Sequence, residues 1–374
     1  MTTMAPIWSK QPFKTIYTTV ILFETLAFVP WLLIRFSLQS ARPYPEWSLK
    51  TSVLTPIFRI AFKWYTATRY SGMSAVISDH KKASHRHALA APADASYYSG
   101  VLAPGKAVPA PVGGLWYPTP LFATSPDIEN TKVVLHFPGG AFVLAFGQET
   151  WGKVVTGALL KYSKASHAFF AQYRVVSDDT TRFPAAIQDI LTCYNYILSL
   201  GIRPQNVIIG GDSAAGNLVL GLLRHMETSP PISLPFPGAV MLWSPWVHVT
   251  SRAGADFRSQ RTSANDSITA DLLQWGADAY FPDHEPTEEE VAYISPLNHP
   301  FHASVPLYIH ACTAEGLYYW IQEFADQMAN FPGNRVKFSS TRNATHDLIF
   351  AYDREGREED VKLVIEEAMR FFEL

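Results

Sequence analysis

The sequence predicts an α/β fold with a mostly parallel central sheet flanked by helices. Two observations support this prediction. From residue 131 onward, short apolar segments typical of buried strands alternate with helical patterns, and that alternation requires crossover connections between parallel strands. In addition, 48% of the 374 residues are hydrophobic, so the chain has enough apolar material for one large domain or two ordinary ones.

The predicted elements follow one another in regular order. We expect strands at 132–137, 167–173, 206–211, 238–244 and 306–312, with a final strand near 335–341 and helices near 150–163, 184–199 and 214–226. Before them, residues 92–130 are rich in Pro and Gly, and the part at 102–118 is typical of a loop that leads into an edge strand. Active sites of parallel α/β sheets lie at the carboxyl ends of the strands, so we expect the functional residues there.

The N-terminal part of the chain is both basic and apolar. Residues 1–90 hold eleven Lys or Arg and three acidic residues, a net charge of +8, whereas the whole chain carries −3. The segment 15–34 has the length of a membrane-spanning helix and is flanked by basic residues on both sides. We therefore expect residues 1–40 to form an uncleaved, single-pass anchor in the endoplasmic reticulum or another endomembrane. The charge on both flanks leaves open the side on which the rest of the chain lies.

Two alternatives to this anchor remain open, because Glu24 and Pro30 interrupt the apolar segment. One is a cleaved signal peptide, although no small-residue cleavage site follows the segment. The other is an amphipathic helix on a membrane surface.

Composition also limits the partners and cofactors. Nucleic-acid binding is not expected, because the basic residues are spread among Trp, Phe and Leu rather than clustered. Cys193 and Cys312 are the only cysteines, too few for a disulfide framework or a zinc site built on cysteine. We expect no metal and no cofactor, and the oligomeric state stays open.

The stretch "VIIGGDSAAGNL", residues 207–218, passes from an apolar strand into a turn of small residues centred on Ser213. A nucleophilic serine on a sharp strand-to-helix turn needs small neighbours, which gives the pattern G-x-S-x-G. Here Gly211 fits the pattern, but Ala215 stands at the second glycine and Gly216 follows it. Ser213 is therefore either a catalytic nucleophile or a hydroxyl in a tight turn.

Three further segments supply the groups that a nucleophilic serine requires. The turn "HFPGGAF", 136–142, offers the amides of Gly139 and Gly140, with Ala141, as donors to an oxyanion. Glu315 directly follows the strand at 306–312, and His346 follows the last strand. Structural alternatives stay open for each: a Pro-Gly turn, a glutamate at a helix start, and an ordinary histidine. Asp212, beside the serine, is expected to accept backbone N–H bonds at the helix start and steady the turn.

With these motifs together, the chain resembles the hormone-sensitive-lipase-like branch of the α/β-hydrolases, including fungal membrane-anchored steryl acetyl hydrolases. The likeness covers roughly residues 105–374 and rests on "HFPGGAF" (136–142), "YRVVSDDTTRFPAAIQDI" (173–190), "GDSAAGNL" (211–218), "SPW" (244–246), "AEGL" (314–317) and "HD" (346–347). The order serine, acid, histidine is the one that α/β-hydrolases use. The resemblance implies the nucleophile Ser213, the acid Glu315, the base His346 and the oxyanion donors Gly139, Gly140 and Ala214.

The chain departs from the family pattern at three positions. Pro138 stands where the family's oxyanion motif opens with His, Ala141 replaces the last glycine of that motif, and Ala215 stands in the turn after the serine. These departures bear on efficiency more than on the chemistry.

The resemblance also implies the domain organisation. A cap and linker are expected at 41–100 and a catalytic domain at 101–374, with a second cap segment inserted at about 247–300. Five aromatic residues in or next to this insert are candidates to line an apolar pocket, with ordinary packing as the alternative: Trp246, Phe257, Trp275, Tyr280 and Phe281.

The function expected from these features is hydrolysis of a hydrophobic ester, such as a lipid, sterol or secondary metabolite, by a membrane-anchored serine carboxylesterase or deacetylase. One alternative is a biosynthetic enzyme that uses the same residues for acyl transfer, cyclisation or condensation. Another is a ligand-binding protein without activity. The sequons at Asn265 and Asn343 become glycosylation sites if this part of the chain faces a secretory lumen.

Overall fold

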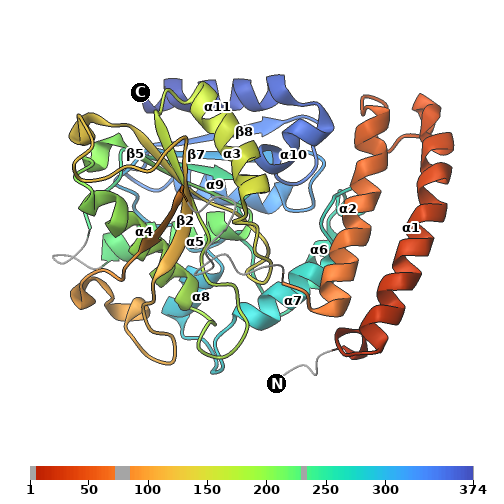
Figure 1. The fold of residues 1–374 in the computed structure, drawn as a ribbon, viewed down its shortest axis with the longest axis horizontal. Helices are drawn as coiled ribbons and strands as arrows, with labels where there is room; N and C mark the ends of the chain where they lie inside the picture. The colour runs from red at the N-terminus through yellow and green to blue at the C-terminus, as the bar shows by residue number, and fades with distance from the viewer. Residues whose placement is uncertain (1–5, 72–84, 229–233, 374) are drawn as a thin grey trace.

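The computed structural model describes residues 6–71, 85–228 and 234–373. At its centre is an eight-stranded sheet with the strand order β1-β2-β4-β3-β5-β6-β7-β8 (Figure 1). The strands are β1 (His87–Ala90), β2 (Val112–Tyr117), β3 (Val133–Phe137), β4 (His167–Ala171), β5 (Val207–Asp212), β6 (Ala239–Trp243), β7 (Leu307–Cys312) and β8 (Val336–Thr341). All neighbours from β4 to β8 pair in parallel, which confirms the predicted fold class.

The antiparallel edge of the sheet differs from the expectation. We expected the Pro- and Gly-rich stretch to lead into an edge strand, but that strand, β2, lies between β4 and the unpredicted strand β1, and it pairs antiparallel with both. β2 is therefore not an edge strand, because β1 pairs with its outer side and forms the edge of the sheet. With only four residues, "HALA", β1 is too short to show the period-two pattern of a strand.

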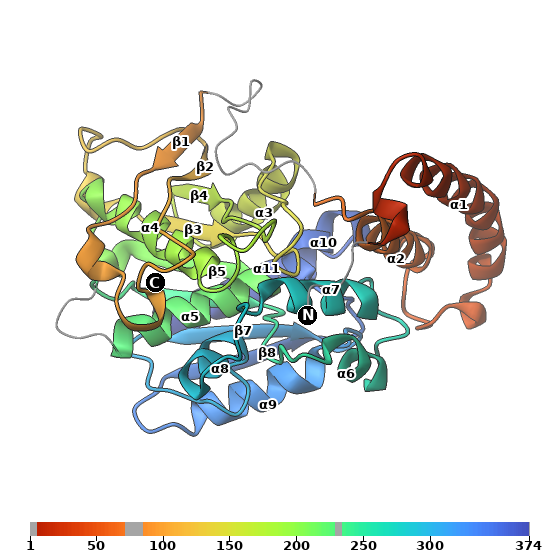
Figure 2. The same cartoon turned by 90° about the horizontal axis from the view of Figure 1, so that it is seen from below.

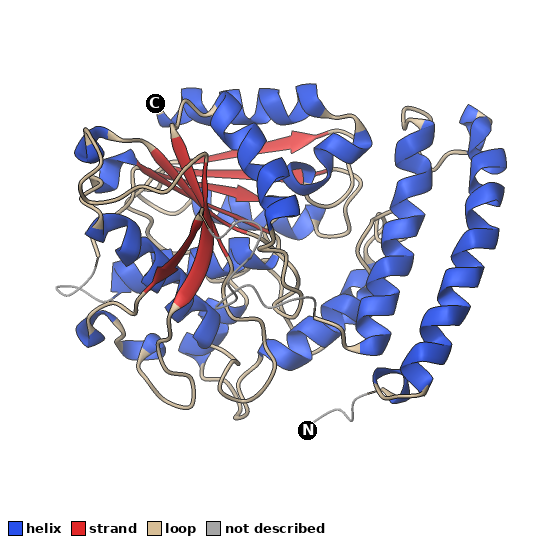
Figure 3. Ribbon diagram, viewed as in Figure 1, coloured by secondary structure: helices blue, strands red, loops and turns tan. Residues whose placement is uncertain are grey.

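Two helical layers cover the sheet, as Figure 3 shows. One face carries α3 (Glu149–Tyr162), α10 (Leu348–Glu355) and α11 (Glu358–Phe372), and the other carries α4 (Ala185–Ser199), α5 (Ala214–Thr228) and α9 (Tyr318–Ala329). Residues alternate between the two cores along each central strand. In β3, for example, Leu135 and Phe137 face the α5 side and Val134 faces the α11 side, as expected for a strand buried on both faces.

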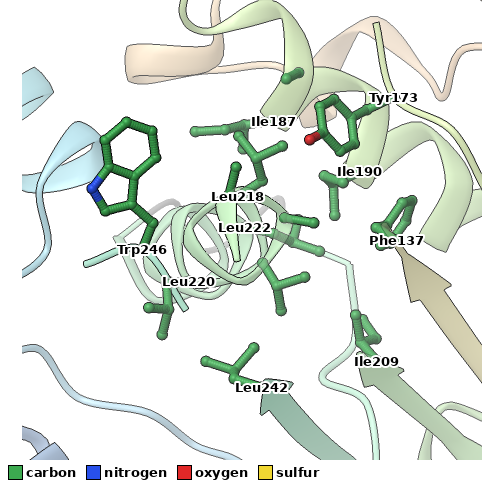
Figure 4. Packing of buried hydrophobic residues seen from close by; sticks show 14 of the residues in the cluster. Phe137, Tyr173, Ile187, Ile190, Ile209, Leu218, Leu220, Leu222, Leu242 and Trp246 are labelled. Carbon is green, nitrogen blue, oxygen red and sulfur yellow. The ribbon is translucent and has the colours of Figure 1, made fainter. Parts of the chain in front are cut away.

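Helix α5 lies in the middle of the larger core. Figure 4 shows its Leu218 and Leu222 between Ile187 of α4 and the strand residue Ile209, and each of these side chains is fully buried. Burying a leucine or isoleucine side chain stabilises a fold by roughly 1.5–3 kcal/mol. This packing fixes the start of α5, and therefore the turn that carries Ser213, against the strand ends.

Five helices lie around the carboxyl end of the sheet or beside it. Between β6 and β7 the chain forms α6 (Ala253–Ser259), α7 (Ala270–Tyr280) and α8 (Glu288–Ile294). The N-terminal helices α1 (Phe13–Ser37) and α2 (Leu49–Thr68) form a pair at one side of the molecule, with α2 against α7 and α10 (Figures 1 and 2). Within the described ranges, α1 is the helix long and apolar enough to cross a membrane. Residues 72–84, part of the expected N-terminal cap, lie outside the described residues.

Candidate active site

Ser213 occupies a strained turn between β5 and α5. Its φ is 52°, a left-handed conformation that costs a residue other than glycine roughly 1–3 kcal/mol. Backbone bonds hold it there: Ser213 donates to the Trp243 carbonyl at 2.8 Å and accepts from the Trp246 amide at 2.9 Å. The strain presents the hydroxyl at the carboxyl edge of the sheet.

The alanine at position 215 fits this turn. A Cβ added at Gly211 would lie 2.8 Å from the carbonyl carbon of Ala215, and one added at Gly216 would lie 2.8 Å from Cβ of Pro245. The two crowded positions are therefore those that carry glycine, and the Ala215 methyl is fully buried without displacing the serine. The departure from G-x-S-x-G moves the second glycine by one residue.

The structure brings Ser213, His346 and Glu315 together. Nε2 of His346 lies 2.9 Å from Oγ of Ser213, and Nδ1 of His346 lies 2.6 Å from Oε2 of Glu315. A neutral His346 that donates from Nδ1 to the carboxylate therefore accepts at Nε2 from the serine hydroxyl. The three residues come from the ends of β5, β7 and β8, which parallel pairing places at one edge of the sheet.

A fourth residue, Asp266, supports this chain of hydrogen bonds from the loop before α7. Its carboxylate accepts from the backbone amides of His346 at 3.0 Å and Gly316 at 2.8 Å. It thus connects the loops of the histidine and the glutamate. Sequence reasoning missed Asp266, because it lies 80 residues from His346 in the expected cap insert, away from the strand ends where the functional residues were expected.

The electrostatics of the buried group favour a charged pair. Burial lowers the pKa of His346, but its hydrogen bond to Glu315 and the negative charges of Glu315, Asp266 and Asp212 outweigh burial, so the pKa is raised from its ordinary value of 6.5. Burial raises the pKa of Glu315, and the charge of His346 opposes that rise. The site therefore stabilises the imidazolium that forms when a base takes a proton.

The turn at 138–141 lies directly against the serine. A Cβ added at Gly139 would lie 2.6 Å from Oδ2 of Asp212 and 2.8 Å from Cβ of Ser213. The amide of Gly139, however, donates to that same Asp212 oxygen at 2.5 Å. Because this N–H is occupied, the expectation that Gly139 donates to an oxyanion needs correction: Gly139 holds Asp212 instead. Among the described residues, the amides of Gly140, Ala141 and Ala214 have no hydrogen-bond acceptor.

Asp212 therefore has a different partner from the one expected. It bonds to the amide of Gly139 and to Nε2 of the buried His136 at 2.9 Å, not to the start of its own helix. The ring of His136 stacks on Phe170 within the sheet. Asp212, the residue before Ser213, thus connects the turn at 138–141 with His136 at the end of β3.

A second carboxyl group, that of Asp347, faces Asp212. Burial first, and then the charge and hydrogen bond of Asp212, raise the pKa of Asp347 well above its ordinary value of 3.8. The residue has φ 69°, and its Oδ1 is buried without a hydrogen-bond partner among the described residues. Burial and the neighbouring Asp212 carboxylate therefore favour the protonated form of Asp347.

A pocket opens above Ser213 and His346, and helices from three parts of the chain line it. Phe58 and Phe62 come from α2, Leu272 and Leu273 from α7, and Phe350 from α10. The five aromatic residues predicted as candidates for the pocket lie elsewhere: Trp246, Phe257, Trp275, Tyr280 and Phe281 are not among its lining residues. Tyr280, for example, is fully buried and stacks on Phe142 at 3.8 Å between ring centroids. The cap expected at 41–100 includes α2, but no residue of this helix, neither Phe58 nor Phe62, was predicted from the sequence to line the site.

No group of three or more His, Cys, Asp or Glu side chains in the described part of the chain is arranged to hold a metal ion.

The sheet, the strained serine turn and the hydrogen-bonded histidine at the strand ends define a protein of the α/β hydrolase class. The family profile described as "alpha/beta hydrolase fold" matches residues 134–350. Because this match covers more than half of the chain, the chain belongs to that family.

Curated relatives match over shorter segments. An "Esterase" of Acinetobacter venetianus is 31% identical over 158 residues, 41% of this chain and 47% of the relative. An "Acetyl-hydrolase" of Streptomyces hygroscopicus is 25% identical, covering 46% of this chain and 56% of the relative. "Carboxylesterase/phospholipase LipF" of Mycobacterium tuberculosis is 26% identical, covering 53% of this chain and 51% of the relative. The chain thus spans about half the length of these relatives.

Solved structures resemble this fold over a larger share of the chain than the curated relatives match. An esterase from the bacterial hormone-sensitive lipase family has a TM-score of 0.61 at 18% identity, covering 87% of this chain and 99% of that one. Carboxyl esterase 2 of the fungus Tuber melanosporum has a TM-score of 0.56 at 18% identity, covering 71% and 84%. At these identities the likeness is one of fold.

Proposed function

We propose that the protein is a serine carboxylic-ester hydrolase that uses Ser213 as nucleophile, His346 as base and Glu315 as the acid that orients the base. The observation that carries the proposal is the unbroken hydrogen-bonded line from the Ser213 hydroxyl to the buried Glu315 carboxylate. The names of the matched relatives, esterase and acetyl-hydrolase, support it.

In the first half of the proposed reaction, Ser213 Oγ attacks the ester carbonyl carbon while His346 Nε2 takes the hydroxyl proton. The amides of Gly140, Ala141 and Ala214, which have no other acceptor among the described residues, donate to the oxyanion of the tetrahedral intermediate. His346 then gives its proton to the leaving alcohol oxygen, and the acyl group stays on Ser213. Glu315 remains ionised and balances the imidazolium charge.

In the second half, a water molecule attacks the acyl carbon and His346 takes one of its protons. When the second tetrahedral intermediate collapses, His346 returns the proton to Ser213 Oγ and the carboxylic acid leaves. Asp266 acts as a positioning residue in both halves, because it holds the backbone of His346 and of Gly316.

We further propose that the substrate is a hydrophobic ester, such as a lipid, sterol or secondary metabolite. The apolar walls of the pocket, among them Phe58, Leu272 and Phe350, support this choice. We also propose that α1 attaches the protein to a membrane, with residues 41–100 capping a catalytic domain at 101–374, because α1 is long and apolar enough for membrane contact.

Active-site labelling with a fluorophosphonate probe tests the proposed nucleophile. We expect an adduct on Ser213, no labelling of Ser213→Ala or His346→Ala, and unchanged labelling of Ser199→Ala, a control at an exposed serine on α4. Release of acid from p-nitrophenyl esters should follow the same pattern. Labelling or ester hydrolysis that survives in Ser213→Ala would contradict the proposal, and labelling without hydrolysis would favour acyl transfer to another acceptor.

A further inference from the structure

The outer face of α1 is apolar along its whole length. Exposed apolar side chains recur every three or four residues, the spacing of one helix face: Ile16, Val20, Phe23, Ile34 and Leu38 are 45–74% exposed. Ala27 and Pro30 continue the same stripe. A continuous exposed apolar surface of this kind marks an interaction site.

The inner face of α1 packs against α2. Leu32 and Phe36 of α1 are buried with Val53 of α2, and Nε1 of Trp64 in α2 donates to Oγ1 of Thr18 at 2.9 Å. The first contact joins the end of α1 to the beginning of α2, and the second joins the beginning of α1 to the later part of α2. The two helices are therefore antiparallel and run side by side (Figures 1 and 2).

The α2 helix is in turn attached to the rest of the protein along its length. Near its start, Thr51 Oγ1 donates to the Glu355 carbonyl at 3.3 Å. In its middle, the Arg59 guanidinium donates to the Asp266 carbonyl at 2.6 Å. At its end, the Arg69 guanidinium lies 4.6 Å from the ring centroid of Trp275. The body of the protein thus extends alongside the helix pair.

This attachment conflicts with an upright, membrane-spanning α1. A bilayer crossed by α1 over its 25 residues, about 37 Å at a rise of ~1.5 Å per residue, would also enclose α2 and the adjoining surface of the body. That surface is charged: Lys63 of α2 is exposed, and Arg258 of α6 and Asp271 of α7 form an ion pair with side chains 61% and 63% exposed. Charged side chains within the hydrocarbon core carry a large free-energy cost.

We propose that α1 lies in the plane of a membrane, with the stripe of Ile16, Val20, Phe23, Ile34 and Leu38 immersed in one leaflet, and does not cross the bilayer. Lys10 and Arg35, exposed near the two ends of α1, then face lipid headgroups, to which basic side chains are attracted. The remainder of the protein stays in water on one side.

The arrangement places the pocket next to the lipid. Phe58 and Phe62, which line it, belong to α2, the helix between α1 and the body. A hydrophobic ester dissolved in the leaflet therefore has one helix between it and Ser213. This step rests on the proposed membrane attachment and is independent of the proposed catalytic roles.

Single-cysteine labelling in sealed vesicles separates the two orientations. The native cysteines, Cys193 and Cys312, are buried, so Lys10→Cys before α1 and Ser199→Cys on the body provide exposed reporter positions. We expect a membrane-impermeant maleimide to label both variants or neither, with both labelled after detergent. Labelling of only one of the two in intact vesicles would place them on opposite sides and overturn the proposal.

Flotation with phosphatidylcholine–phosphatidylserine vesicles tests the occupant of the stripe. Phe23→Glu with Ile34→Glu should reduce vesicle partitioning roughly 100-fold, whereas Leu363→Glu, a control at a leucine on α11 that is 52% exposed, should not. A wild-type protein that stays off vesicles and forms dimers broken by the double variant would show that a second copy covers the stripe, against the proposal. If the wild-type protein floats with the vesicles but does not hydrolyse esters, only the proposed catalytic roles are overturned, and the proposed membrane orientation stands.

Discussion

Nδ1 of His346 lies 2.6 Å from Oε2 of Glu315, and both side chains are buried. Burial alone would lower the pKa of the histidine, but the hydrogen bond and the charge of this carboxylate raise it from 6.5. A proposed base with a raised pKa is protonated over more of the acidic range. The contact between His346 and Glu315 therefore determines the pH at which activity should be lost as the solution becomes more acidic.

We expect kcat/KM for ester hydrolysis to fall as the pH falls through the pKa of His346, above 6.5, because only the neutral imidazole accepts the Ser213 proton. Glu315→Gln removes the charge that raises this pKa, so the acid limb should move to lower pH. The plateau rate should drop about 10⁴-fold. A pH series with p-nitrophenyl butyrate measures both effects, and an acid limb that does not move in the variant would contradict the prediction.

Asp266→Asn should weaken both the fold and the activity. The substitution keeps the shape but replaces a charged acceptor of backbone amides from Gly316 and His346, and a hydrogen bond to a charged group contributes about 1.5–3 kcal/mol. We expect the free energy of unfolding to fall by roughly 2 kcal/mol or more and kcat to fall more than KM changes. Urea denaturation and steady-state kinetics test this, and Asp271→Asn at an exposed position is the control. Equal effects of the two substitutions would show that Asp266 has no special role.

Gly139→Ala should disable the proposed site. The new methyl would lie 2.8 Å from Ser213 Cβ and 2.6 Å from Asp212 Oδ2, so the turn and the serine cannot both keep their places. We expect kcat/KM to fall at least about 100-fold, because a displaced turn also moves the amide of Gly140, and the loss of one oxyanion donor has an effect of that size. Gly157→Ala on α3, with nothing within 4 Å of the added methyl, should leave activity unchanged and should not destabilise the fold. Normal hydrolysis by Gly139→Ala would refute the assignment of this turn.

The central sheet was predictable because most of its parallel strands are short apolar runs and alternate along the chain with helical patterns; β8, "VKFSST", is the more polar strand at the edge of the sheet. The same regularity led to Ser213, Glu315 and His346, since residues that end parallel strands meet at one edge of the sheet. Strand β1 could not be predicted, because four residues with mixed burial show no alternation.

The contacts between distant segments were not predictable either. Asp266 was missed because its carboxylate receives backbone amides, which leave no residue-type signal in the partner segments. Phe58 and Phe62 were missed for a related reason: the sequence shows that α2 is apolar and basic, but not which helices of the body it packs against. The role of Gly139 changed because the sequence does not reveal that Asp212 reaches its amide.

Asp347→Asn should stabilise the protein at neutral and alkaline pH. The pKa of Asp347 is raised well above 3.8 in the folded protein, so the unfolded chain loses its proton first, and stability is lost as the pH rises from 3.8 toward the folded value. Asparagine carries no titrating group and tolerates a positive φ, here 69°. Thermal unfolding of both proteins at about pH 5 and about pH 8 should show a gain in Tm that is larger at the higher pH. A gain that does not grow with pH would mean that Asp347 is ionised in the folded protein.

Phe58→Ala should change the substrate preference rather than the chemistry. The ring lines the pocket above Ser213 from α2, so its loss removes apolar contact with the distal part of a long acyl or alcohol group, while a short acetyl group does not reach it. We expect kcat/KM for a long-chain p-nitrophenyl ester to fall roughly 10- to 100-fold, with little change for the acetate. Phe28→Ala, on α1 and outside this pocket, is the matched control for loosening of the helix pair. If Phe58→Ala lowers kcat/KM for the long ester alone, α2 forms a wall of the substrate pocket. If both variants lower kcat/KM for both esters equally, α2 affects activity only through folding, and the prediction is wrong.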